Sequence, residues 1–146
     1  MRRVTAPLEH DVPTRVTRTA ALEGWSDSLV SGQIVAVRVD ADERNANLGH
    51  QRYWLARLRS AAFTLSENTL HAGTQYDAGF VLCKAEWYNL VQESERGYRL
   101  LPDEIYLSVN DMVRLTGIDW EKREGVGRSA KYILSERIHN EIEHAV

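Results

Sequence analysis

Cysteine is almost absent from this chain of 146 residues, in which Cys83 is the only one. A single cysteine excludes an internal disulfide and a zinc site built from several thiolates. The two arginines at positions 2 and 3 are not followed by the apolar stretch of a secretory signal. We therefore expect a protein that is not secreted and that works in a reducing compartment, the nucleus or, alternatively, the cytoplasm.

Long hydrophobic runs and a dominant charge sign are missing as well. No apolar run approaches the roughly 20 residues that span a bilayer, so we expect no membrane partner. The formal net charge is −3, with 27% charged residues of both signs. Nucleic-acid interfaces usually carry a basic footprint, which this balance disfavours. A local patch at Arg52, Arg57 and Arg59 keeps nucleic-acid binding open as an alternative.

Motifs that carry catalytic chemistry are also lacking. The five histidines are scattered, and none belongs to an H-E-x-x-H metal motif. There is no G-x-S-x-G elbow, and Gly125-Val126-Gly127 lacks the strand and the further glycine of a dinucleotide fingerprint. Cys83 lies on the apolar register of its segment, where a thiol is usually inert. We expect a non-catalytic protein that needs no metal and no cofactor.

The chain offers instead short segments in which aromatic residues are interleaved with alternating apolar ones. They are Gln33–Val39, Arg52–Leu58, Phe80–Tyr88 and Glu104–Leu115. Segments of this kind, joined by polar loops, are typical of small β-barrels. We therefore predict a mainly β protein with an extended arm at 1–24, a barrel at 25–120 and a C-terminal helical region at 121–146.

The predicted helix covers Arg128–Val146 and is amphipathic. Leu134, Ile138 and Ile142 follow one another at a spacing of four, which places them on one face. This stripe can pack on the barrel, which is the preferred interpretation, or pair with another chain. The three residues are therefore also candidates for contact with a partner subunit.

Two chromatin-associated families resemble the core region over roughly residues 32–118. Val35-Ala36-Val37-Arg38 followed by Tyr53-Trp54-Leu55-Ala56-Arg57-Leu58 resembles a Tudor pattern. Glu86-Trp87-Tyr88, then Glu104-Ile105-Tyr106-Leu107-Ser108, then Val113-Arg114-Leu115 with a glycine at 117, resembles a bromo-adjacent homology (BAH) domain. The resemblance implies an SH3-like small β-barrel of the Tudor or BAH type that binds a histone tail or another peptide in the nucleus.

Recognition of a methylated lysine would require aromatic faces around the ammonium, assisted by a carboxylate. Tyr53, Tyr88 and Tyr106 lie on the register opposite the apparent core, and Trp87 supplies a further wall if it sits at the rim. Glu86 is the nearest acid in sequence. These five residues are the candidates for an aromatic cage, although Trp87 also fits the core and the tyrosines also fit cross-strand pairs.

Three functions thus remain open. The first is a peptide reader, with or without a methylated lysine. The second is an assembly module whose barrel and helix contact other subunits of a protein complex. The third is a nucleic-acid-binding barrel that uses aromatic and arginine side chains.

Overall fold

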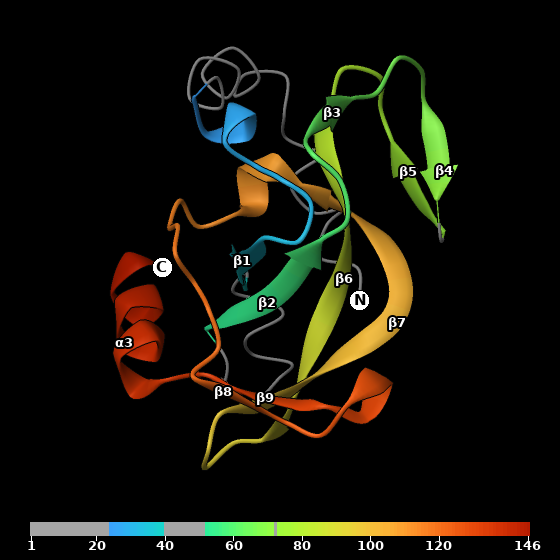
Figure 1. Ribbon diagram of the computed structural model, residues 1–146. Coiled ribbons are helices and arrows are strands. Elements are labelled where there is room, and N and C mark those ends of the chain that lie inside the picture. The colour runs from blue at the N-terminus through green and yellow to red at the C-terminus, as the bar shows by residue number, and fades with distance from the viewer. Residues whose placement is uncertain (1–23, 40–51, 72) are drawn as a thin grey trace.

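The computed structural model describes residues 24–39, 52–71 and 73–146, and its centre is one antiparallel sheet (Figure 1). The strand order in this sheet is β1-β2-β6-β7-β9-β8, and the short strand β3 also pairs with β6. The strands are β1 (Ile34–Arg38), β2 (Tyr53–Leu58), β3 (Phe63–Thr64), β6 (Val81–Gln92), β7 (Gly97–Ser108), β8 (Lys122–Glu124) and β9 (Lys131–Ile133). A separate hairpin consists of β4 (Thr69–His71) and β5 (Thr74–Tyr76).

The long hairpin of β6 and β7 forms the middle of the sheet. Its register is interrupted: Glu86 pairs with Glu104 and Tyr88 with Leu100, so β7 carries more residues than β6 between these two pairs. Pro102 lies inside this bulged stretch. A proline has no N–H to give to a ladder, so it is tolerated where the pairing is broken.

The chain returns to the outer edge of β1 after β7. The 3₁₀ turn η2 (Val109–Asp111) is followed by a single bridge between Met112 and Val37. The Val113 N–H donates to the Ala36 carbonyl at 2.8 Å. Over the described residues the protein is mainly β with a C-terminal helix, as predicted, but the sheet is not closed into a barrel. This contact with β1 is short, and β9 and β8 extend the sheet beyond β7.

The C-terminal helix is shorter than the sequence indicated. Helix α3 covers Glu136–Ala145 and starts at Ser135, whose hydroxyl accepts a hydrogen bond from the Ile138 N–H at 3.1 Å. The residues before it form β8, the 3₁₀ turn η3 (Gly127–Ser129) and β9. Because β9 pairs with β7, the sheet continues past residue 120. The predicted arm at 1–24, apart from Gly24, and the polar loop at 40–51 lie outside the described residues.

Two hydrophobic cores lie on opposite faces of the sheet. The first contains Val35, Ala56, Cys83 and Leu107, which the alternation of their segments places on the apolar face, and also Phe80 and Leu82 of the opposite register. The inward face expected from the alternation is therefore confirmed for most of these residues.

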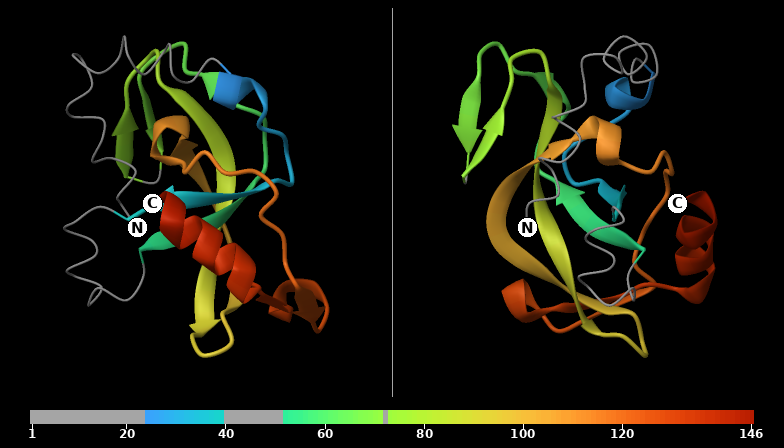
Figure 2. Two further views of the ribbon diagram at one scale, coloured as in Figure 1. Left: turned by 90° about the vertical axis from the view of Figure 1, so that its left-hand side faces the viewer. Right: turned by 180° about the vertical axis from the view of Figure 1, so that it is seen from behind.

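The opposite register is buried too, which the sequence did not indicate. The second core contains Ile34, Ala36, Tyr53, Leu55, Tyr88, Tyr98, Val113, Ile118, Leu134, Ile138 and Ile142. Helix α3 covers this face, while the β4–β5 hairpin projects away from the far end of the sheet (Figures 1 and 2). No helix of the described part is long and apolar enough to cross a membrane.

Candidate functional site

The structure does not bring the five cage candidates together. Tyr53 and Tyr88 lie in the second core with 4% and 7% of their surface exposed, whereas Trp87 is buried in the first core. Tyr106 packs against the first core from β7 and stays partly exposed. Glu86 faces two arginines. The idea that the outward register is exposed is therefore wrong for Tyr53 and Tyr88, because a second core occupies that face.

Trp87 has the environment of a core residue. Its ring meets Trp54 edge to face, with centroids 5.5 Å apart and an interplanar angle of 80°. Aromatic pairs prefer such tilted contacts inside a core. The side chain is consequently part of the packing between β2 and β6.

Tyr88 belongs to an aromatic cluster under the C-terminal segment. Trp120 lies 4.8 Å from its ring and Tyr132 lies 5.7 Å from it, both edge to face. Tyr98 also contacts Trp120, at 5.5 Å. Burial raises the pKa of Tyr88, as expected for a phenol inside such a cluster. The sequence reading missed Trp120 and Tyr132, because both lie beyond the segments that the strand pattern defined.

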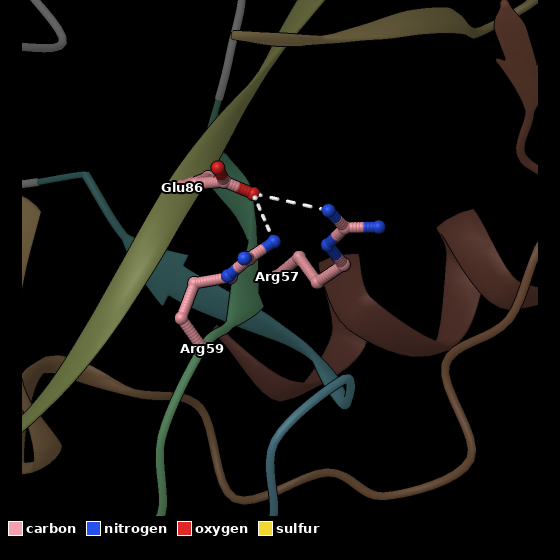
Figure 3. A network of polar contacts seen from close by, with 3 residues as sticks. All are labelled: Arg57, Arg59 and Glu86. Atoms are coloured by element: carbon pink, nitrogen blue, oxygen red, sulfur yellow. Dashed lines mark hydrogen bonds and ion pairs between the residues drawn. The ribbon is translucent and has the colours of Figure 1, made fainter. Parts of the chain in front are cut away.

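The basic residues of the sequence patch are engaged in ion pairs. One Glu86 oxygen accepts from Arg57 at 3.1 Å and from Arg59 at 3.3 Å (Figure 3). Arg52 pairs with Glu143 of α3 at 3.2 Å. Each pair lowers the positive potential that these arginines offer to phosphates. Glu86, in turn, already has cationic partners of its own.

The helical residues proposed as partner contacts are buried within the chain. Leu134, Ile138 and Ile142 all belong to the second core, and Ile142 is completely covered. The intramolecular interpretation of the stripe fits this structure. These three side chains offer no surface to another subunit.

An aromatic patch surrounds Tyr106, the one cage candidate that remains partly exposed among the tyrosines. His71 of β4 stacks on its ring with centroids 4.2 Å apart and planes 12° apart. Phe63 of β3 meets the ring edge to face at 5.8 Å, and Tyr76 of β5 does so at 5.4 Å. We call these four residues the Tyr106 patch. Its rings come from four separate strands, and the sequence indicated only Tyr106.

The same hairpin is tied to the edge of β7 by two polar contacts. His71 Nε2 donates to the Glu104 carbonyl at 3.4 Å, and the Tyr76 hydroxyl donates to the Tyr106 carbonyl at 3.5 Å. Asp103 and Glu104 are exposed beside the patch. Burial raises the pKa of Tyr76 to about 12, so this hydroxyl stays protonated at neutral pH. Aromatic rings and acidic residues therefore both occur at this end of β7.

A polar cavity lies at the other end of β7, between the β6–β7 turn and α3. Its volume is about 220 Å³. It is lined by Arg52, Tyr53, Leu90, Glu93, Arg96, Tyr98, His139 and Glu143. Apart from Leu90, every lining residue carries a group that can form hydrogen bonds or titrate.

Hydrogen bonds connect the inner wall of this cavity. The Tyr53 hydroxyl lies 2.7 Å from His139 Nδ1, and Tyr98 lines the same wall. Burial raises the pKa of Tyr53 strongly and that of Tyr98 to about 12, so both remain neutral phenols. For His139, burial disfavours the protonated imidazole and lowers the pKa, although the negative charge of Glu143 acts in the opposite direction. The inner wall is consequently a chain of neutral polar groups at physiological pH.

The geometry of the described residues offers no metal centre, since no group of three or more His, Cys, Asp or Glu side chains converges there. Burial raises the pKa of the Cys83 thiol to about 12, which removes its nucleophilic form at neutral pH. No family model, no curated protein and no solved structure matches this chain.

Proposed function

We propose that this chain is a non-catalytic recognition module that binds a basic peptide, such as a histone tail, at the Tyr106 patch. The observation that carries the proposal is the position of a partly exposed tyrosine among three further rings, with the exposed residues Asp103 and Glu104 shortly before it in β7. Lysine, methyl-lysine and arginine side chains are attracted to aromatic faces by about 0.5–2 kcal/mol per contact. The carboxylates of Asp103 and Glu104 add attraction for the same cations.

The stacked position of His71 suggests how such a ligand binds. Its imidazole lies flat on Tyr106, in the place that a cationic side chain would take over the ring. His71 is held there by a single long hydrogen bond to a carbonyl. A basic side chain of the peptide would replace it on Tyr106 as the end of the hairpin moves outward.

The finer fold that we propose is an SH3-like barrel of the Tudor or BAH type with an open seam. The return of the chain to β1 through η2, Met112 and Val113 supports it. This return lies at the position of the short strand that the BAH resemblance implies. A module of this kind would act as part of a chromatin-bound complex in the nucleus.

The experiment that tests the function is a peptide array with unmodified and mono-, di- and trimethylated lysines, followed by titration of the hits. We expect binding to basic peptides to fall about tenfold in Tyr106→Ala, and to fall less in Glu104→Gln. Tenfold corresponds to about 1.4 kcal/mol, in the range of one or two cation–π contacts. Equal affinity for the unmodified and all methylated peptides would show that the site recognises only the positive charge of the lysine.

Two control variants test whether any loss of binding is specific to the Tyr106 patch. Leu101→Ala removes an exposed apolar side chain from the same strand, and Glu141→Gln removes a carboxylate from α3. Both should bind as the parent does. A folded Tyr106→Ala protein with unchanged affinity for every peptide on the array would rule out this site.

A further inference from the structure

Arg96 is the most unusual residue of the polar cavity. It lies in the turn between β6 and β7 with a φ of 53°, and it is the only non-glycine residue with positive φ in the described part of the chain. For a residue with a long side chain this conformation costs about 1 kcal/mol or more. A residue that is retained despite such strain often has a functional side chain.

The sequence offers a glycine directly after Arg96, which could have taken this conformation instead. Gly97 is instead required for close packing. A Cβ there would lie 2.9 Å from Lys131 Cδ, because β9 packs closely against the start of β7. The turn is also fixed on both sides. The Arg96 N–H donates to the Glu93 carbonyl, and its carbonyl accepts from the Leu134 N–H, both at 3.1 Å. The backbone therefore holds the Arg96 side chain in place.

One N–H group of the Arg96 guanidinium is buried without a hydrogen-bond acceptor. Arg96 Nε is buried and has no hydrogen-bond partner. A buried N–H of a charged group is costly to leave unpaired, and its partner must be an acceptor because guanidinium groups only donate. The side chain lines the cavity together with the hydroxyls of Tyr53 and Tyr98. Burial raises the pKa of both tyrosines and the positive charge of Arg96 opposes it, whereas for His139 burial and Arg96 both lower the pKa.

We propose that this cavity binds a carboxylate group through the Arg96 guanidinium and the Tyr98 hydroxyl. Charge-assisted bonds from a guanidinium to a carboxylate are about twice as strong as neutral ones. A volume of about 220 Å³ is small, so it admits a small acid or the end of one peptide chain.

The charges around the cavity favour a single negative charge over two. Two guanidiniums and two carboxylates line it, and Arg52 is already paired with Glu143 at 3.2 Å. Glu93 lies exposed at the turn. A dianion such as phosphate would face both of these carboxylates, and repulsion from each would oppose the attraction of Arg96. A monoanionic carboxylate gains the same donors against a smaller repulsion.

The test is an NMR titration of the ¹⁵N-labelled chain, with the Nε–H resonance of Arg96 as the direct probe. Sodium acetate and sodium phosphate are added separately at constant ionic strength, which is maintained with sodium chloride. We expect acetate to shift this resonance with saturation in the millimolar range, corresponding to about 4 kcal/mol. Phosphate should bind at least threefold more weakly. If acetate leaves the resonance in place, no carboxylate binds beside Arg96 and the proposal is overturned; tighter binding of phosphate would overturn the choice of carboxylate.

The matched variants are Arg96→Gly and Arg99→Gln. Glycine adopts the backbone conformation of residue 96 without strain, so loss of acetate binding in this variant cannot be attributed to a misfolded turn. In that variant the probes are the backbone amides around Tyr98. Arg99 is exposed three residues beyond the turn, so its replacement should leave acetate binding unchanged.

A second pair of probes separates the two sources of a carboxylate. A short peptide with a free C-terminus and its C-terminal amide differ only in that group. Binding of the acid and not of the amide assigns the cavity to a chain terminus, whereas binding of acetate alone assigns it to a small free acid. Equal binding of peptide acid and amide would contradict recognition of a carboxylate.

Discussion

The packing of α3 on the sheet can be tested with a single substitution, Ile142→Ala. Ile142 is completely buried in the second core. The change removes three carbon atoms, which at about 0.8 kcal/mol each gives about 2.4 kcal/mol of lost burial. A cavity term adds to this, so we expect the free energy of unfolding to fall by about 2–4 kcal/mol.

The measurement is urea unfolding followed by the fluorescence of the four tryptophans. The midpoint should fall while the slope m stays the same, because the surface exposed on unfolding is nearly unchanged. For a chain of this length the melting temperature should drop by roughly 5–15 °C. The control is Asn140→Ala, at an exposed position of the same helix, which should change stability by less than about 0.5 kcal/mol.

The refuting result is an Ile142→Ala protein as stable as the Asn140→Ala control. The stripe would then not be buried against the sheet of its own chain. Sedimentation of the parent at increasing concentration would show whether the stripe instead pairs with a second copy. That outcome would make the stripe a contact surface for the assembly function, which was expected to use the sheet and the helix.

Three further predictions concern the polar cavity. Tyr53→Phe removes the hydroxyl that bonds His139 Nδ1 and should cost about 1–2 kcal/mol in urea unfolding, because a partly buried ring nitrogen loses its partner. Since the folded pKa of His139 lies below its unfolded value of about 6.5, its neutral form stabilises the fold above that value. Stability should thus fall as the pH drops from about 7 to about 5, and His139→Gln should flatten this part of the stability profile. Arg96→Gly should raise the thermal midpoint, because it relieves about 1 kcal/mol of backbone strain.

The strand pattern predicted the first core correctly because period-2 alternation assigns one face without knowledge of the rest of the fold. Val35, Ala56 and Cys83 all share the buried face. The pattern could not reveal the second core, since its cover comes from α3 and from the stretch at 113–120, far along the chain. The sequence nevertheless contained an indication of the second core. The apolar stripe of the helix must be buried against another apolar surface, and Tyr53 and Leu55 lie on the face of the sheet to which no cover had been assigned.

The polar cavity had no local signature at all. Arg96 and His139 are far apart in sequence, and each is ordinary in its own segment. They meet because the Leu134 N–H binds the Arg96 carbonyl and thereby ties the start of the helical segment to the β6–β7 turn. The Tyr106 patch likewise depends on the β4–β5 hairpin, whose stretch the sequence indicated only as a polar connection.

The arrangement of the two cores places the two proposed sites far apart. In the described part of the chain both faces of the inner strands are used for packing, and the proposed sites lie at the ends of β7, with Tyr106 at one end and Tyr98 at the other. The contacts at these ends involve different elements, the β4–β5 hairpin in one case and α3 in the other. We therefore expect saturating acetate to change the affinity for a basic peptide by less than about twofold, as measured by peptide titration in both conditions. A larger effect would be a coupling free energy between the two ends, and reciprocity would then require the peptide to change the affinity for acetate by the same factor.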